Sequence, residues 1–354
     1  MTNHRTDFDI HRPGALIAAL PAVLGFVPEK SLVLVSLENG GLGSVMRADL
    51  SAKLSERVEQ LAELAAASDP KAAIAVIVDA DADAACCPQC NEEQRQLCAA
   101  LNAALSRRDI VLWAAHVVDR IAVGGRWHCV DGCGSGGVID DPSASPLALA
   151  AVLDGRRLYP RRADLEAVIA IDERAHSAEL AAAITQQSAA RQIAHHADPI
   201  GCCRRDVEDT VTAAAQLADG QPLSEMELVR LGCAVSDAQV RDALYGLAIG
   251  ERAAEAESLW AVLARMLPEP WRVQALVLLA FSAYARGDGP LAGVSLQAAL
   301  RSDPGDRMAG MLDTALQSGL RPEQIRELAV TGYRRAAELG ARLPPQQVFG
   351  RRAG

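Results

Sequence analysis

Residues 72–80 read AAIAVIVDA, and this short stretch decides the fold of the first half of the chain. The residues before Asp79 are apolar on both faces of a strand, which predicts a central strand covered on two sides. Upstream, SLVLVSL at 31–37 and SVMRADL at 44–50 flank the turn signal NGG at 39–41. These two runs predict a β-hairpin within the same domain.

Helical and strand patterns then alternate along the chain. Apolar residues recur at helical spacing in 52–67 and again in 92–106. The runs DIVLWAAHVV at 109–118 and GRWHCV at 125–130 are typical of strands. The order β-β-α-β-α-β-β predicts an α/β domain with a mixed sheet flanked by helices.

The first domain is expected to span residues 1–146. It ends in a stretch rich in glycine and proline, DGCGSGGVIDDPSASP at 131–146. We expect a flexible exit loop there. From 147 to 340 helical runs alternate with short breakers, which predicts an all-α domain of packed helical hairpins. Residues 341–354 are expected to form a flexible tail.

One helical hairpin is especially clear. The segment LVLLAFSAYARGDGPLAGVSLQAALRSDP at 276–304 follows the tetratricopeptide pattern. Gly287 and Asp288 form the expected turn, and Pro304 ends the second helix. One such unit cannot bury its own apolar face, so neighbouring helices must stack on it. We therefore expect a tetratricopeptide-like domain, with a plain helical bundle as the alternative.

The composition restricts the partners and the compartment. The net charge is −10, which opposes nucleic-acid binding because such binding needs a basic surface. No apolar run is long enough to cross a bilayer. The nine cysteines are odd in number and include adjacent residues, so they make a poor disulfide framework and favour a reducing cytoplasm.

Four cysteines stand in two close pairs. Cys87 and Cys90 have C-x2-C spacing, and Cys129 and Cys133 have C-x3-C spacing. Two such pairs at strand ends provide the four thiolates that a tetrahedral structural zinc ion requires. A redox pair and inert buried thiols are the alternatives. A further group, HHADPIGCC at 195–203, is interpreted as a helix terminus followed by a loop.

Charged residues near the strand ends form a second group of candidates. Arg47 and Asp49 fall on the same face of their strand, where they could bind a phosphate or carboxylate, or form a structural ion pair. Asp79, Asp81 and Asp83 follow the central strand. Carboxylates there could hold Mg²⁺ or simply form a solvated strand exit.

Several segments carry a family resemblance. ALPAVLGFVPEKSLVLVSL at 19–37 joins unusual proline and glycine positions to a strand, and MRADL follows at 46–50. Later segments of the same kind are GRWHCV, VRDALYGLA and PWRVQALVLLA. In these segments the chain resembles the DUF4192 family of actinobacterial proteins, over about residues 13 to 330. The resemblance implies a cytosolic protein and no established activity.

Helical repeat surfaces mostly bind peptides or other proteins, so we expect a non-enzymatic interaction or adaptor protein that contacts its partner through the helical domain. Nucleic acid and membranes are not expected partners. The alternative is a small-molecule-binding or hydrolytic enzyme that uses Arg47, Asp49 and Asp79. A concave pocket joining these three side chains would favour the enzyme, whereas a groove along the helices would favour the adaptor.

Overall fold

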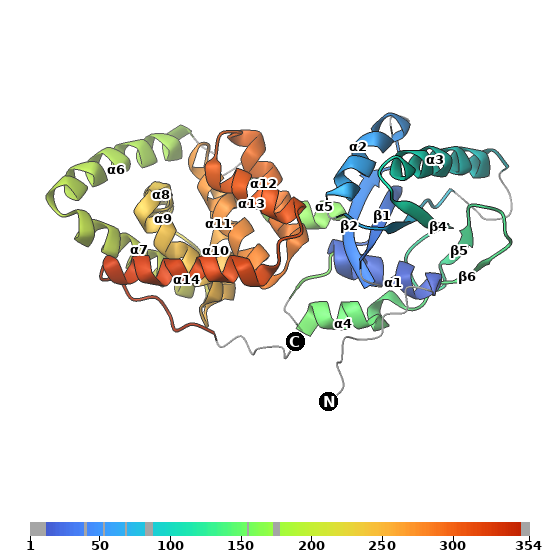
Figure 1. Cartoon of the computed structure of the whole chain (residues 1–354). Coiled ribbons are helices and arrows are strands. Elements are labelled where there is room, and N and C mark those ends of the chain that lie inside the picture. The colour runs from blue at the N-terminus through green and yellow to red at the C-terminus, as the bar shows by residue number, and fades with distance from the viewer. Residues whose placement is uncertain are drawn as a thin grey trace. The chain divides into compact units, whose positions relative to one another are not determined.

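The computed structural model in Figure 1 describes residues 12–38, 41–51, 54–67, 69–81, 88–153, 156–172 and 178–347. Its contacts divide the chain into two compact units, Met1–Asp164 and Leu165–Gly354. This division falls later than the expected boundary after residue 146. The reason is that α4 (Pro146–Leu153) packs against α1 (Pro13–Leu24) and thus belongs with the first unit.

The first unit is built around a mixed sheet in the spatial order β2-β1-β3-β4-β5-β6. The pair β3–β4 is parallel, and the other neighbouring pairs are antiparallel. The predicted mixed sheet is therefore confirmed. The strands are β1 (Ser31–Glu38), β2 (Gly41–Asp49), β3 (Ala72–Val78), β4 (Val111–Val118), β5 (Arg126–Cys129) and β6 (Gly136–Val138).

The stretch 131–146 contains more regular structure than the expected loop. Strand β6 forms within it and pairs with β5, because Trp127 lies opposite Gly137 in an antiparallel register. A short 3-10 turn, η1 (Pro142–Ala144), follows, and Asp141 caps it by accepting a hydrogen bond from Ser143 N. The strand β6 is too short and too rich in glycine to show a strand pattern in the sequence.

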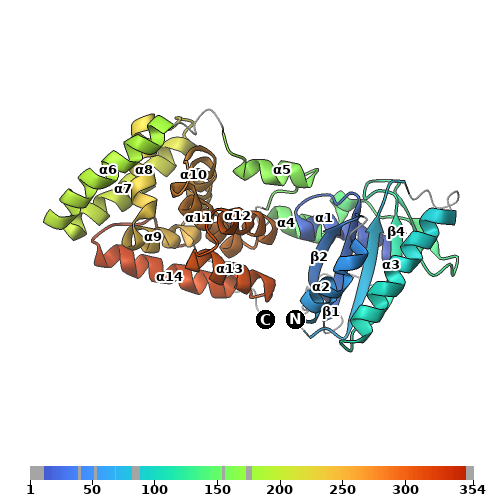
Figure 2. The same cartoon turned by 90° about the horizontal axis from the view of Figure 1, so that it is seen from above.

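Helices cover both faces of the sheet (Figures 1 and 2). On one face lie α2 (Leu54–Ala66) and α3 (Pro88–Ser106), and on the other lies α1. Strand β1 shows why two covers are needed. Leu32 and Leu34 belong to the core beneath α2 and α3, whereas Val33 points to the opposite face and is also fully buried.

The second unit is helical in the part that the structure describes. Its longer helices are α6 (Ala178–Ala197), α7 (Pro199–Ala218), α8 (Glu225–Ser236), α10 (Ala253–Met266), α11 (Trp271–Arg286), α12 (Gly289–Ser302), α13 (Arg307–Gln317) and α14 (Pro322–Glu338). Shorter pieces are α5 (Arg162–Glu166), which spans the division between the units, α9 (Ala238–Leu244), and the 3-10 segments η2 (Ala167–Ile169) and η3 (Tyr245–Ile249). None of the described helices combines the length and apolar character needed to cross a lipid bilayer.

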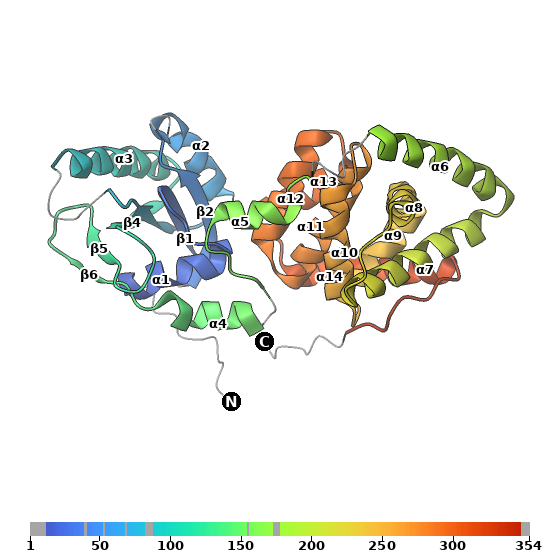
Figure 3. The same cartoon turned by 180° about the vertical axis from the view of Figure 1, so that it is seen from behind.

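Helix α11 lies at the centre of this unit, with α10, α12 and α14 packed against it (Figure 3). Its C-terminal cap is Gly287, whose φ of 90° is the left-handed conformation that glycine adopts most readily. Asp288 then caps α12 by accepting a hydrogen bond from Leu291 N at 3.1 Å. The predicted helical hairpin, including its turn, is therefore confirmed.

Candidate functional site

Arg47 on β2 is held by three neighbours. Its Nε donates a hydrogen bond to Ser31 Oγ at 2.8 Å, its guanidinium pairs with Asp49, and its Cζ lies 5.7 Å from the centre of the Phe26 ring. Only 10% of the Arg47 side chain is exposed, compared with 74% for Asp49. These contacts are those of a structural ion pair supported by a cation–π contact.

Asp79 follows β3 and has different partners. Its Oδ1 accepts a hydrogen bond from Asp81 N at 3.2 Å, and Asp81 pairs with Lys30 at 2.7 Å. The interaction with Asp81 raises the pKa of Lys30, so the ammonium stays charged beside these acids. Asp83 lies outside the described residues. The two described aspartates therefore match the solvated strand exit expected as one alternative.

The three predicted ligand-binding residues, Arg47, Asp49 and Asp79, lie at one end of the sheet. This follows from the register, because Ser31 on β1 pairs with Asp49 on one side and with Val78 on the other. The structure has one hollow beside the β5–β6 loop and another beside α7, both described below. None of the three residues lines either hollow. Arg47 instead bonds to Ser31 and Asp49, whereas Asp79 accepts its hydrogen bond from the backbone of Asp81.

The loop between β5 and β6 gathers potential metal ligands. Cys129 Sγ, Cys133 Sγ and a carboxylate oxygen of Asp131 all lie within 4.8 Å of one another. Cys129 is paired across the sheet with His116 of β4, and its Sγ lies 3.5 Å from His116 Nδ1. The predicted partner Cys87 lies outside the described residues. The C-x3-C pair is thus close enough to share one ion.

Burial and mutual proximity determine how these groups ionise. Burial, followed by the neighbouring Cys133 and Asp131, raises the pKa of Cys129 to about 11. Burial also lowers the pKa of His116, which favours the neutral imidazole. The backbone N–H of Cys133 donates to Asp131 at 3.0 Å and lowers the pKa of that carboxyl group. The loop thus brings Asp131 and Cys133 close to Cys129, and β4 places the largely neutral imidazole of His116 on the other side of Cys129.

A hollow of about 300 Å³ lies beside the same loop. Gln94 and Arg95 of α3 form one wall, and the loop with Cys129 forms the other. Gln94 is 7% exposed, and its Nε2 is buried without a hydrogen-bond partner in the part of the chain that the structure describes. Cys90 precedes Gln94 by one turn of α3, but its side chain is outside that part.

Two residues of this cluster were not predicted from the sequence. Asp131 stands inside the Cys129-x3-Cys133 spacing, so its position was a usable signal. His116 lies 13 positions before Cys129, and only the pairing of β4 with β5 brings the two together. Register between strands is not visible in a single strand pattern.

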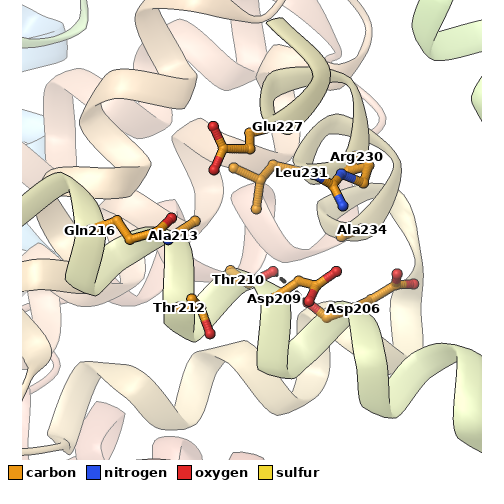
Figure 4. A pocket seen from close by; sticks show the side chains of 10 residues that line it. All are labelled: Asp206, Asp209, Thr210, Thr212, Ala213, Gln216, Glu227, Arg230, Leu231 and Ala234. Carbon is orange, nitrogen blue, oxygen red and sulfur yellow. Dashed lines mark hydrogen bonds between the residues drawn. The ribbon is translucent and has the colours of Figure 1, made fainter. Parts of the chain in front are cut away.

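The second unit has an open groove between α7 and α8 (Figure 4). It encloses about 190 Å³, and side chains from the two helices face each other across it. The lining has three acidic side chains, Asp206, Asp209 and Glu227, and one basic side chain, Arg230. Leu231 adds an apolar side chain. The other lining residues are Thr210, Thr212, Ala213, Gln216 and Ala234. This groove is acidic, and sequence reasoning did not identify it.

The HHADPIGCC segment forms a tight junction of two helices, so the loop expected there is reduced to Asp198 between α6 and α7. Here His195, Cys203 and Asp237 approach within 4.8 Å of one another. Asp237 already caps α9 and pairs with Arg191 at 3.0 Å. Burial raises the pKa of Cys203 to about 11, so its thiol stays neutral. These contacts suit a structural junction better than a metal site.

Comparison with known proteins supports the resemblance seen in the sequence. A family model described as "Domain of unknown function (DUF4192)" matches residues 13–323, a segment that contains the sheet, the cysteine loop and the α7–α8 groove. Neither the curated proteins nor the solved structures gave a match. Because the match covers most of the chain, this protein belongs to the DUF4192 family.

Proposed function

We propose that this chain is a non-enzymatic interaction module whose helical unit binds a segment of another protein in the α7–α8 groove. The observation that carries the proposal is the chemistry of the groove, in which carboxylates from two helices surround an apolar surface. The complementary partner is a peptide segment that presents an arginine or lysine beside an apolar residue.

The size of the groove supports a side chain of a peptide as its occupant. Its volume of about 190 Å³ is below the roughly 300–1,000 Å³ typical of small-molecule pockets. Leu231 and Ala213 supply apolar side chains to its lining, although only a small fraction of each is exposed. A groove of this size would hold one long side chain and leave the rest of a peptide on the helix surfaces.

Two carboxylates provide the charge for recognition. Asp209 is exposed on α7, and Glu227 is half-buried on α8, where its Oε2 accepts a hydrogen bond from Ser224 N at 2.8 Å. The hydroxyl and backbone N–H of Ser224 lower the pKa of Glu227, so this group is ionised at neutral pH. Asp206 contributes less, because Arg191 pairs with it at 2.6 Å.

The rival function, an enzyme at the strand ends, has less support. Its site would require Arg47, Asp49 and Asp79 to face one ligand. Arg47 instead contacts the Phe26 ring and pairs with Asp49. Asp79 accepts a hydrogen bond from the backbone N–H of Asp81. We propose the cytoplasm as the compartment, because the cysteines whose side chains the structure describes are free thiols, namely Cys98, Cys129, Cys133, Cys202, Cys203 and Cys233.

Panning a library of random short peptides against the immobilised full-length protein tests the groove. We expect the selected peptides to share a basic residue beside an apolar one. Fluorescence polarisation with the selected peptides should then show about a tenfold weaker affinity for the double variant Asp209→Asn/Glu227→Gln, since two attractive charges are removed. Glutamine at 227 retains the capping box of α8, so the helix is preserved.

The matched control is the double variant Glu208→Gln/Glu225→Gln. It removes two exposed acidic charges from the same helices but outside the groove. Its affinity should stay within about twofold of the unmodified protein, because neither side chain lines the groove. Equal losses in both double variants, or selected peptides without a basic residue, would contradict the proposed function.

A further inference from the structure

The β5–β6 loop carries donor atoms whose spacing suits a metal ion. Cys129 Sγ lies 3.5 Å from His116 Nδ1. In a tetrahedral zinc site, a sulfur at about 2.3 Å and a nitrogen at about 2.0 Å from the metal are separated by about 3.5 Å. The observed separation therefore equals one edge of such a tetrahedron. Cys133 Sγ and an Asp131 oxygen lie within 4.8 Å of Cys129 Sγ, and both side chains are exposed, so their rotation toward Cys129 and His116 would complete the tetrahedron.

The side-chain types also match zinc. Thiolate, imidazole and carboxylate are its usual protein ligands, and four protein ligands are typical of a structural site. His116 is 4% exposed and held in the sheet, so its ring is already positioned before an ion binds. Asp131 is oriented by the backbone N–H of Cys133 at 3.0 Å, a hydrogen bond of the kind that orients metal ligands.

Gln94 gives a second and independent observation. Gln94 lines the same hollow as Cys129, and its buried Nε2 has no hydrogen-bond partner in the part of the chain that the structure describes. A buried N–H donor without an acceptor is unfavourable. A metal ion deprotonates the cysteines that bind it, and a thiolate sulfur is a stronger acceptor than a thiol. An occupied site would therefore supply the acceptor that Gln94 lacks.

We propose that His116, Cys129, Asp131 and Cys133 bind one zinc ion that fixes the β5–β6 loop to β4. Gln94 acts as an outer partner of the bound thiolates and does not contact the metal. This ligand set shares Cys129 and Cys133 with the four-cysteine site expected from the sequence. It differs in that His116 and Asp131 replace the other cysteine pair.

Cobalt(II) is the probe for this site, because it occupies tetrahedral zinc sites and absorbs visible light. The full-length protein is stripped with a chelator under reducing conditions and titrated with Co²⁺. We expect one ion per chain, the visible bands of tetrahedral coordination, and a thiolate-to-cobalt charge-transfer band with the intensity of two thiolates. Added Zn²⁺ should remove these bands.

Variants at exposed positions test the ligands without disturbing the core. We expect Cys133→Ser to abolish the tetrahedral bands and Asp131→Asn to weaken Co²⁺ binding by at least about tenfold. Circular dichroism of both variants reports whether the fold is retained. The matched control is Cys98→Ala, which removes a buried thiol of α3 outside the cluster and should leave Co²⁺ binding unchanged.

The double variant Cys87→Ser/Cys90→Ser separates the two ligand sets. The proposed site predicts that this variant keeps the bands and the affinity for Co²⁺. Loss of the bands in this variant would overturn the proposed ligand set in favour of four cysteines. A charge-transfer intensity of four thiolates, or no tetrahedral bands in the unmodified protein, would overturn it as well.

Discussion

At the junction of α6, α7 and α9, the guanidinium of Arg191 lies between two carboxylates. Its Nε is 2.6 Å from Asp206 Oδ2, and its Nη2 is 3.0 Å from Asp237 Oδ2. All three side chains are at most 21% exposed, so solvent screens the charges only in part. The junction therefore places three titratable groups in a largely buried setting.

The pKa values of the two carboxylates move in opposite directions. Burial raises the pKa of Asp206 above 3.8. Burial would also raise the pKa of Asp237, but the N–H of Val240 and the charge of Arg191 outweigh it and lower that pKa below 3.8. The stabilising contribution of Asp237 is thus present above pH 3.8 and is lost as the pH falls through its folded pKa. That of Asp206 is complete below pH 3.8 and is lost as the pH rises through its folded pKa.

We therefore expect Asp237→Asn and Asp206→Asn to change the pH dependence of stability in opposite senses. The contribution of each residue is the free energy of unfolding of the unmodified protein minus that of the variant. This difference should shrink below pH 3.8 for Asp237 and above pH 3.8 for Asp206. Urea unfolding between about pH 3 and about pH 6 measures both differences. Asparagine at 237 still caps α9, so the charge alone is tested. If the two free-energy differences changed with pH in the same direction, the opposite pKa shifts of Asp206 and Asp237 would be wrong.

At the scale of elements, α14 meets η3 through two glycines. The helix packs against the 3-10 segment, and a Cβ added to Gly332 would lie 2.8 Å from the Cα of Gly246. Side chains do not approach backbone atoms so closely, so the two elements are in direct backbone contact. The absence of a side chain at 332 is therefore what permits α14 to dock.

Gly332→Ala should destabilise the protein by about 1–3 kcal/mol, because the added methyl group overpacks the contact between α14 and η3. The control is Gly310→Ala in α13, where an added Cβ has no atom within 4 Å. That change should stabilise the protein by about 0.5–1 kcal/mol, since alanine is the better helix former. Thermal unfolding followed by circular dichroism measures both, and a Gly332→Ala variant as stable as the unmodified protein would refute the contact.

At the scale of the whole molecule, the division after Asp164 implies a second unit with its own core. Trp260 and Phe281 are fully buried within it. Its first residues are tied to later helices, because Arg272 donates to Ile169 O at 2.8 Å and Asp172 N donates to Arg265 O at 2.9 Å. The start of the unit is thus part of its structure.

We expect the fragment 165–354 to fold alone, with a helical circular dichroism spectrum and a cooperative melting transition. A fragment beginning at residue 178 should melt about 5 °C lower, because the buried Arg272 loses the carbonyl of Ile169. Differential scanning calorimetry of the two fragments provides the comparison. An unfolded longer fragment, or equal melting temperatures, would argue against the division.

Local patterns predicted much of this architecture. The apolar run of β3 gave a buried strand, and the turn at Gly287–Asp288 gave the α11–α12 hairpin, because each depends on residues adjacent in the chain. The strand β6 was not predicted, because a strand of three residues that includes two glycines shows no hydrophobic periodicity. The division after Asp164 was not predicted either, because α4 belongs to the first unit only through its packing against α1.

The sequence by itself determined the fold class, the order of the elements, the family resemblance and the C-x3-C pair at Cys129 and Cys133. Tertiary structure alone decided that His116 lies beside that pair, that Arg191 joins three helices, and that α7 and α8 form an acidic groove. The physical reason is that periodicity and turn chemistry act between near neighbours in the chain. A site instead depends on strand register and helix packing between segments that are distant in the chain.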